Sequence, residues 1–236
     1  METNMRMLAA YHKEPSLRHI SHLDVQRTLH RALARAKIPV RYSEGFNPHP
    51  AMSFAAALAT GMAGEAEYFD VRLDEDVLPS AFECRLNAAL PRGLFVSDAA
   101  AAPEGLGSLT GALLAAAYEA EVRTGAPVSE EALRAALDAL MGGPVIVSKR
   151  SKSGVKDTDI RPQILRASAE RLGDGGFALR ALGRLRADGG LRMELLIRAL
   201  FDRLGTEGTA AICRKALYFG WGSPLPGLPR ELYPME

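Results

Sequence analysis

The sequence predicts an α+β protein built from two tandem ferredoxin-like (βαββαβ) units. Stretches of alternating apolar and polar residues are interleaved with stretches of helical periodicity. Over residues 1–98 they follow the order β-α-β-β-α-β, which is that of a split βαβ unit. A less regular second round occupies residues 112–221, after an Ala-, Gly- and Pro-rich linker at 99–111. The proline-rich residues 222–236 are expected to form an extended tail.

The first unit opens with a strand at residues 5–11. Ser21 is then placed to cap a helix, Asp24 lies in the first turn, and the helix should stop before Pro39. Apolar residues at helical spacing form its buried face: Val25, Leu29, Ala32, Leu33 and Ala36. The remaining expected elements are a strand at 39–43, a loop at 45–50, a strand at 67–73, a helix at 79–90 and a strand at 94–97.

The second unit follows the same logic with weaker periodicity. Its expected elements are a strand at 117–123, a helix at 129–141, strands at 144–148, 160–170 and 177–185, and a helix at 192–204. Ser129 caps the first of these helices and Gly142-Gly143 closes it. The stretch 210–218 fits either a strand or a helix.

Composition excludes several classes of protein. The 236 residues are 47% hydrophobic with a net charge of +1, which argues against disorder. No apolar run is long enough to cross a membrane, and residues 1–10 lack a signal-peptide pattern. Cys84 and Cys213 are the only cysteines, so a disulfide scaffold is excluded. We therefore expect a cytoplasmic protein that does not associate with a membrane.

The near-zero net charge conceals segregated charge. Residues 1–50 hold eight Lys or Arg and four Asp or Glu, together with all five histidines, whereas residues 65–76 hold six acids and one Arg. Residues 147–166 hold six bases and two acids. Two basic blocks separated by acidic stretches suggest local patches, although a mixed solvated surface is an equally good interpretation.

Known cofactor motifs are missing from the sequence. Two distant cysteines cannot hold an iron–sulfur cluster, and there is no phosphate-binding or dinucleotide-binding glycine pattern and no Cys/His zinc spacing. We therefore expect no cofactor and no metal. The spacing of His22, Asp24 and His49 is not diagnostic of a metal site.

The predicted helix at 22–37 carries a stripe of arginines. Arg27, Arg31 and Arg35 follow one another at intervals of four residues, with Asp24 on the same side. Guanidinium groups in a row suit a phosphate backbone, because each presents a planar fork of donors. An exposed helix with Asp–Arg pairs is the plainer interpretation of the stripe alone.

The loop at 45–50 adds an aromatic ring and a constrained histidine. Phe46 stands between Gly45 and Asn47, a poor place to bury a ring and a good place to present one. Two prolines flank His49 and restrict its backbone. His49 could contact a base or a phosphate, act as a general acid or base, or simply order the turn.

The second basic block is a polar loop with glycine and serine. Such loops on a sheet often contact nucleic acid. Asp157 and Asp159 precede Arg161, where an ion-paired strand start is a better interpretation than a catalytic carboxylate pair. The block and the arginine that follows supply five candidate phosphate contacts: Lys149, Arg150, Lys152, Lys156 and Arg161.

Two runs of the sequence resemble the signature of the radical-SAM-linked protein family, an uncharacterised bacterial group. They are Ile20–Arg27 (ISHLDVQR) and Tyr42–Pro50 (YSEGFNPHP), within a tighter resemblance over 17–73 and a looser one beyond. Residues 13–16 depart from the family, which more usually has a Gly-containing turn there. The resemblance implies a radical-SAM protein as partner, encoded beside or fused to family members, and a genomic association with ribosome and RNA-processing genes. It implies no established reaction.

Three functional hypotheses follow. The first is an accessory RNA-binding protein that works with a radical-SAM partner in tRNA or rRNA modification or processing. In this hypothesis Phe46 would stack on a base. The phosphate contacts would come from the predicted helix, the segment that follows it and the second basic block: Arg27, Arg31, Arg35, Arg41, Lys149, Arg150, Lys152, Lys156 and Arg161. The second is an RNA-acting enzyme that uses His22, Asp24 and His49. The third is a protein–protein adaptor for the radical-SAM protein.

Overall fold

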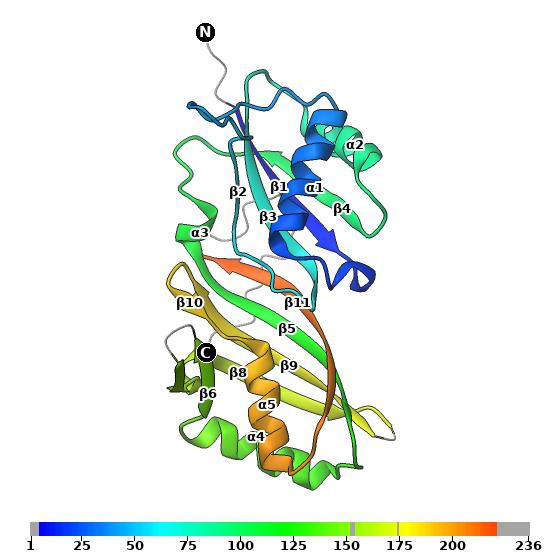
Figure 1. Cartoon of the computed structure of the whole chain (residues 1–236), viewed down its shortest axis with the longest axis vertical. Coiled ribbons are helices and arrows are strands. Elements are labelled where there is room, and N and C mark those ends of the chain that lie inside the picture. Colours follow the sequence, from blue (N-terminus) through cyan, green and yellow to red (C-terminus); the bar gives the residue numbers. More distant parts are fainter. Residues whose placement is uncertain (1–4, 152–153, 174, 221–236) are drawn as a thin grey trace. The chain divides into compact units, whose positions relative to one another are not determined.

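The computed structural model describes residues 5–151, 154–173 and 175–220 (Figure 1). The tail expected at 222–236 lies outside these residues. The chain divides into two compact units, one formed by residues 1–114 together with 216–236, and the other by residues 115–215. Residues 216–220 thus belong with the first unit, and the second unit is inserted between its two parts.

The first unit is a sheet covered on one face by two helices. Strand β1 lies between β3 and β4 and is antiparallel to both, while β2 pairs antiparallel with β3. The last residues of β11 (Gly208–Phe219) complete the unit beside β3, where the rings of Phe219 and Tyr68 meet edge to face. The elements in chain order are β1 (Met5–Lys13), a 3-10 turn (Pro15–Leu17), α1 (His22–Arg35), β2 (Met52–Phe54), β3 (Met62–Leu73), α2 (Pro79–Ala89), β4 (Leu94–Ala101) and α3 (Leu109–Ala112).

Alternation along the strands separates the face that α1 and α2 cover, called here the buried face, from an outer face on which Leu8 and Ala10 are also buried. The buried face of β1 and β3 packs against the apolar faces of α1 and α2, as the sequence predicted for α1. The side chains of this core come from all four elements: Met7, Ala9, Tyr11, Val25, Leu29, Leu33, Phe69, Val71, Leu73, Phe82 and Leu86. Arg6 and Arg72, which are Cα partners across β1 and β3, alternate with these residues and point to the other face.

A charged pair is buried at the end of β1. Lys13 and Glu67 are each only 1% exposed. The Lys13 ammonium donates to the carbonyls of Arg18 at 3.2 Å and Ile20 at 2.8 Å, and so fixes the chain that leads into α1. Burial lowers the pKa of Lys13 from its ordinary value of 10.5, and the negative charge of Glu67 opposes this shift.

The second unit is also a sheet with two helices. Strand β9 pairs antiparallel with β5 on one side and with β8 and the short β10 at different points along its length, and β5 lies next to β11. Strands β6 and β7 form a separate antiparallel hairpin. The elements are β5 (Leu113–Thr124), α4 (Glu130–Gly142), β6 (Ile146–Ser151), β7 (Gly154–Asp159), a 3-10 turn (Arg161–Gln163), β8 (Ile164–Arg171), β9 (Gly176–Arg186), β10 (Gly189–Gly190), α5 (Met193–Leu204) and β11.

The chain is therefore a mixed helix-and-strand protein with mostly antiparallel pairing, but several elements differ from expectation. The prediction of a strand at 39–43 is wrong. This segment forms only two isolated β-bridges, one between Val40 and Leu73 and one between Tyr42 and Pro50. Pro39 and Pro50 lack the N–H groups that a continuous ladder needs. The strand that pairs with β3 is β2, further along the chain at Met52–Phe54.

Other differences lie nearer the second unit. Strand β7 occupies part of the stretch predicted as a polar loop, and its polar residues gave no apolar alternation to detect. The helix α3 forms inside the predicted linker, where Ser108 accepts a hydrogen bond from the Gly111 N–H. The open alternative at 210–218 is resolved as strand β11. No helix within the described part of the chain is long and apolar enough to cross a membrane.

Candidate nucleic-acid interface

The first turn of α1 holds a compact set of polar contacts. Ser21 accepts a hydrogen bond from the Asp24 N–H as the N-cap, and its hydroxyl donates to the Asp24 carboxylate at 2.7 Å. Arg27 donates to the other carboxylate oxygen at 3.1 Å. The Ser21 hydroxyl, followed by Arg27, lowers the pKa of Asp24. Asp24 is thus an ionised capping residue, a poor general base that holds Arg27 in place.

The arginine stripe on α1 divides into residues with different partners. Arg35 donates to the Ala89 carbonyl at 2.6 Å and ties α1 to the end of α2. Arg31 is exposed and, within the described residues, makes no hydrogen bond or ion pair. Arg27 is exposed, and its one ion pair in the described part of the chain is with Asp24. Arg27 and Arg31 are therefore the members of the stripe available to a ligand.

The loop after α1 is a small closed turn. The Ala51 N–H donates to the Arg41 carbonyl and the Ser43 N–H to the His49 carbonyl. The Ser43 hydroxyl oxygen accepts the His49 N–H and lies 3.0 Å from His49 Nδ1. Gly45 has a φ of +120°, a conformation that favours glycine. These contacts hold the loop in one shape without using the Phe46 side chain.

Phe46 stands at the tip of this turn and is fully exposed, with a relative accessibility of 112%. Tyr42, at the base of the turn, is also exposed, as is Leu23 on α1. Large exposed apolar side chains such as Phe46 and Tyr42, which belong to one turn, are typical of interaction sites. Arg41, at the start of the turn, donates to Asp74 at 2.7 Å and is half-buried, so it anchors the loop.

His30 is a half-buried histidine of α1 that the sequence pattern did not single out. It follows Arg27 on the helix by three residues, and its Nε2 atom is buried without a hydrogen-bond partner within the described residues. Burial lowers the pKa of His30, and the positive charge of a protonated His49 lowers it further. His49 of the loop is therefore near enough to His30 for the charge of one to affect the other. The only sequence signal was the concentration of histidines in this region.

His30 predicts a pH dependence of stability. Its pKa is lower in the folded protein than the ordinary value of 6.5, so the unfolded chain binds the proton more tightly. The free energy of unfolding is expected to fall as the pH decreases below 6.5 towards the folded-state pKa. Urea denaturation at several pH values measures this.

The variant His30→Gln should weaken that pH dependence. His19→Gln removes an exposed histidine and serves as the matched control, which should keep the wild-type decline. An identical pH profile for wild type and His30→Gln would contradict the prediction.

The residues proposed for catalysis make contacts with different partners. The His22 ring meets Phe54 edge to face, with centroids 4.6 Å apart. Asp24 contacts Ser21 and Arg27, and His49 contacts Ser43 and Asn47. Within the described residues, no group of three or more His, Cys, Asp or Glu side chains is arranged to hold a metal ion.

The second basic block is only partly described. Lys152 lies outside the described residues, and so do the side chains of Lys149, Arg150 and Lys156. Arg161 donates to the carbonyls of Met141 at 2.9 Å and Ile164 at 2.8 Å, which joins the end of α4 to β8. Its guanidinium group thus has a clear role within the unit.

A family comparison covers most of the chain. Residues 6–192 match the model of a family described as an uncharacterized protein conserved in bacteria (DUF2344). The chain belongs to this family. The description of DUF2344 names no radical-SAM protein, and a search of curated proteins gave no match.

The fold of this DUF2344 chain is similar to parts of chains in solved structures. A chain in a crystal structure of a Cbf5-Nop10-Gar1 complex matches 89% of this chain with a TM-score of 0.54 and 11% identity. A chain in the archaeal box H/ACA sRNP Nop10-Cbf5 complex matches 88% of this chain with a TM-score of 0.47 and 12% identity. The DUF2344 chain spans about half the length of these chains, 48% and 46% respectively. At such low identity the first match shows a shared fold only.

Proposed function

We propose that this DUF2344 protein is a cytoplasmic accessory RNA-binding protein that works with a radical-SAM partner in tRNA or rRNA modification or processing. The RNA-binding surface consists of the turn at 41–51 and the adjoining side of α1. The chain itself supplies binding and positioning, and the partner supplies the chemistry. We call the RNA-binding surface, formed by the turn at 41–51 and the adjoining side of α1, the α1–loop face.

The observation that carries the proposal is the position of Phe46. Burial of an exposed aromatic ring on RNA is favourable, because every base offers a face for stacking. The turn is closed by backbone hydrogen bonds, so little further ordering is needed when the ring is covered. An unstacked base in a single-stranded segment or loop is the ligand that suits it.

The exposed cations of α1 suit the phosphates of the same RNA. Arg31 has no partner within the described residues, and Arg27 is held by one exposed carboxylate, so both can reach a backbone at little cost. Their spacing on one side of α1 matches successive contacts along a strand. The side chains of the second basic block remain further candidates for phosphate contacts.

The radical-SAM partner rests on the resemblance of the Ile20–Arg27 and Tyr42–Pro50 runs. Both runs lie on the α1–loop face or at its base. Co-purification of the full chain with the radical-SAM protein, before and after nuclease treatment, tests the partnership. A complex that survives nuclease favours direct contact and the adaptor role, and a complex lost with nuclease favours a bridge through RNA.

Phe46→Ala is expected to weaken binding of single-stranded RNA by about 1–3 kcal/mol, since one stacked base is lost. Fluorescence anisotropy with a labelled oligonucleotide measures the affinity. Leu78→Ala removes another exposed apolar side chain of the same unit, at the start of α2, and should leave the affinity unchanged. No binding by the wild type at low salt, or equal loss in both variants, would refute the RNA-binding proposal.

Arg31→Gln should weaken binding of every RNA sequence alike and reduce the slope of log affinity against log salt by about 1. The control is Arg92→Gln, another exposed arginine of the first unit, outside the α1–loop face. A salt slope unchanged by Arg31→Gln would remove this residue from the interface.

If purified protein instead cleaves or modifies RNA and His49→Ala abolishes this activity, the enzyme alternative replaces the accessory role.

We also infer that both units are ferredoxin-like. The strand order β2-β3-β1-β4 of the first unit places the first and third strands of a βαββαβ sequence at the centre. The order β8-β9-β5-β11 of the second unit repeats this arrangement. The hairpin β6–β7 would be an insertion into the second unit.

A further inference from the structure

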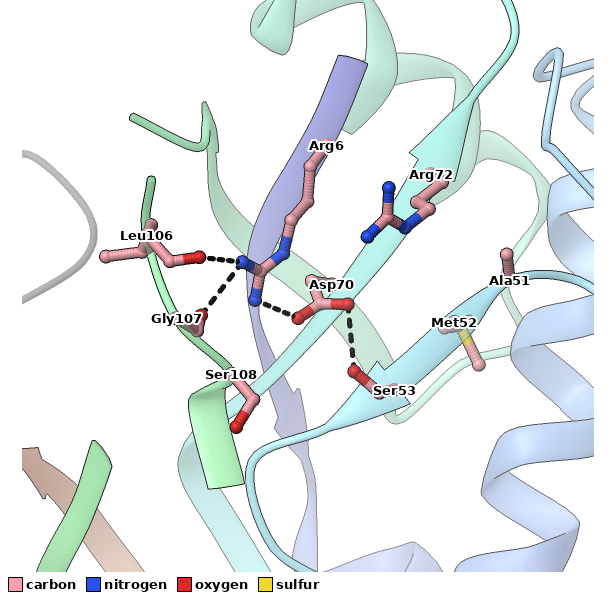
Figure 2. A pocket seen from close by; sticks show the side chains of 9 residues that line it. All are labelled: Arg6, Ala51, Met52, Ser53, Asp70, Arg72, Leu106, Gly107 and Ser108. Atoms are coloured by element: carbon pink, nitrogen blue, oxygen red, sulfur yellow. Dashed lines mark hydrogen bonds and ion pairs between the residues drawn. The ribbon is translucent and has the colours of Figure 1, made fainter. Parts of the chain in front are cut away.

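A polar hollow lies on the outer face of the first unit, away from α1 and α2. Its volume is about 430 Å³, within the range of small-molecule sites. Strand register assembles it: Arg6 on β1 lies across from Arg72 on β3, and Ser53 on β2 lies across from Asp70 (Figure 2). The segment 106–108, just before α3, closes one side.

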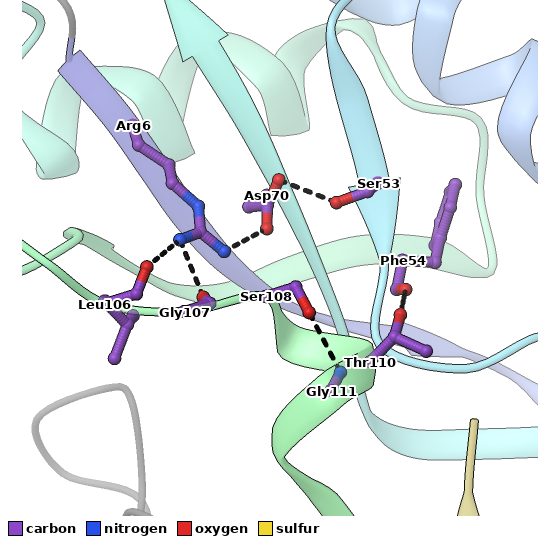
Figure 3. Close-up of polar contacts among 9 residues, drawn as sticks. All are labelled: Arg6, Ser53, Phe54, Asp70, Leu106, Gly107, Ser108, Thr110 and Gly111. Carbon is purple, nitrogen blue, oxygen red and sulfur yellow. Dashed lines mark hydrogen bonds and ion pairs between the residues drawn. The ribbon is translucent and has the colours of Figure 1, made fainter.

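Arg6 and Asp70 form a fixed base for this hollow. One Arg6 nitrogen donates to the Leu106 carbonyl at 2.7 Å and the Gly107 carbonyl at 2.9 Å, and another lies 2.5 Å from an Asp70 oxygen. The other Asp70 oxygen accepts from the Ser53 hydroxyl at 2.9 Å (Figure 3). The Asp70 charge is therefore compensated by Arg6, and both side chains are mostly buried.

Arg72 adds a second positive charge to the same hollow. In Figure 2 its guanidinium group points towards the space beside Arg6 and Asp70. The lining contains two guanidinium groups and one carboxylate, so its local charge is positive. A neighbouring hollow of about 280 Å³ shares Arg6 and Arg72 and is bordered by Glu104.

The other lining groups suit a phosphate ester. The Ser108 oxygen accepts the Gly111 N–H, which leaves the hydroxyl hydrogen free to donate to a ligand (Figure 3). Ala51, Met52 and Leu106 also border the hollow and carry no charge. Planar guanidinium groups bind phosphate oxygens with two parallel hydrogen bonds, which favours phosphate over a diffuse anion.

We propose that this hollow binds the phosphate group of a small phosphorylated molecule of about nucleoside-monophosphate size. Arg72 and the Ser108 hydroxyl contact the phosphate, and Arg6 with Asp70 keeps the strands and the 106–108 segment in position. The site lies on the sheet face opposite to the helices, so it is separate from the α1–loop face proposed for RNA.

Isothermal titration calorimetry of the full chain in phosphate-free buffer tests whether the hollow binds a phosphate ester. The probes are AMP, inorganic phosphate and adenosine. AMP should bind more tightly than inorganic phosphate, and adenosine should bind far more weakly than AMP because it lacks the charged group. Arg72→Gln should weaken AMP binding by about tenfold or more, Arg72→Lys by less, and the control Arg92→Gln not at all.

Several results would overturn the proposal: no heat of binding with AMP and phosphate at millimolar concentration, equal affinity for adenosine and AMP, or unchanged AMP affinity in folded Arg72→Gln. A loss of AMP binding in Arg31→Gln as large as in Arg72→Gln would assign the phosphate to the α1–loop face and also overturn it. Conversely, Arg72→Gln should bind RNA as the wild type does. The absence of RNA binding by the wild type would refute the RNA proposal while leaving the AMP result intact.

Discussion

Replacing Lys13 with methionine is expected to reduce the free energy of unfolding by about 3–5 kcal/mol. The methionine side chain has nearly the same length but no donors, so the Arg18 and Ile20 carbonyls lose a partner where Lys13 is 1% exposed. Glu67, equally buried, loses the positive charge that faces it. Urea denaturation followed by circular dichroism measures the change.

Two further variants identify the cause of that loss. Lys37→Met changes an exposed lysine in the same unit and should alter stability by less than about 0.5 kcal/mol. The double variant Lys13→Met with Glu67→Gln should be less destabilised than the sum of the single variants, since no buried charge then lacks its opposite. A loss below about 1 kcal/mol in Lys13→Met would show that the buried pair contributes little.

Replacing Arg6 with methionine is expected to cost about 3 kcal/mol of stability. The change leaves the Asp70 carboxylate, with a side chain only 10% exposed, without its ion-pair partner, and it removes the donor shared by the Leu106 and Gly107 carbonyls. The 102–108 segment then loses its attachment to β1 through this side chain. Denaturation measures the loss, and limited proteolysis should show new cleavage between residues 102 and 108.

Arg92→Met is the control for this change, because Arg92 is exposed on the same unit and has no partner within the described residues. It should leave both stability and the proteolytic pattern unaltered. Asp70→Asn keeps the shape of the side chain and should be destabilised less than Arg6→Met, because no uncompensated carboxylate remains. Unchanged protection of residues 102–108 in Arg6→Met would show that other contacts hold the segment.

Local signals were sufficient for the helices of the first unit. Ser21 as cap, the apolar spacing from Val25 to Leu33 and the stop before Pro39 predicted α1, which spans His22–Arg35. Local sequence signals failed to predict strands whose formation depends on the strand that pairs with them. The segment 39–43 looked like a strand, but two prolines restrict it to bridges, and the polar strand β7 carried no alternation that could be detected.

The candidate interface was predictable only in part. The exposed ring of Phe46 followed from its glycine and asparagine neighbours, and the arginine stripe followed from helical spacing. The partner of Arg35 lies 54 residues away, and the proximity of His30 to His49 depends on how the turn folds back on α1. The Arg6–Asp70 pair joins residues 64 apart. Such contacts depend on strand register, which one sequence does not specify.

The return of β11 to the first unit has a consequence for biosynthesis. While the chain is still being made, residues 5–114 leave the ribosome first, yet their unit is completed only when residues 216–220 arrive. Until then β3 lacks the neighbour that brings Phe219 to Tyr68, and part of its edge stays open to other chains. The nascent protein should therefore depend on chaperones until β11 has been translated, and fragments that end before residue 216 should aggregate.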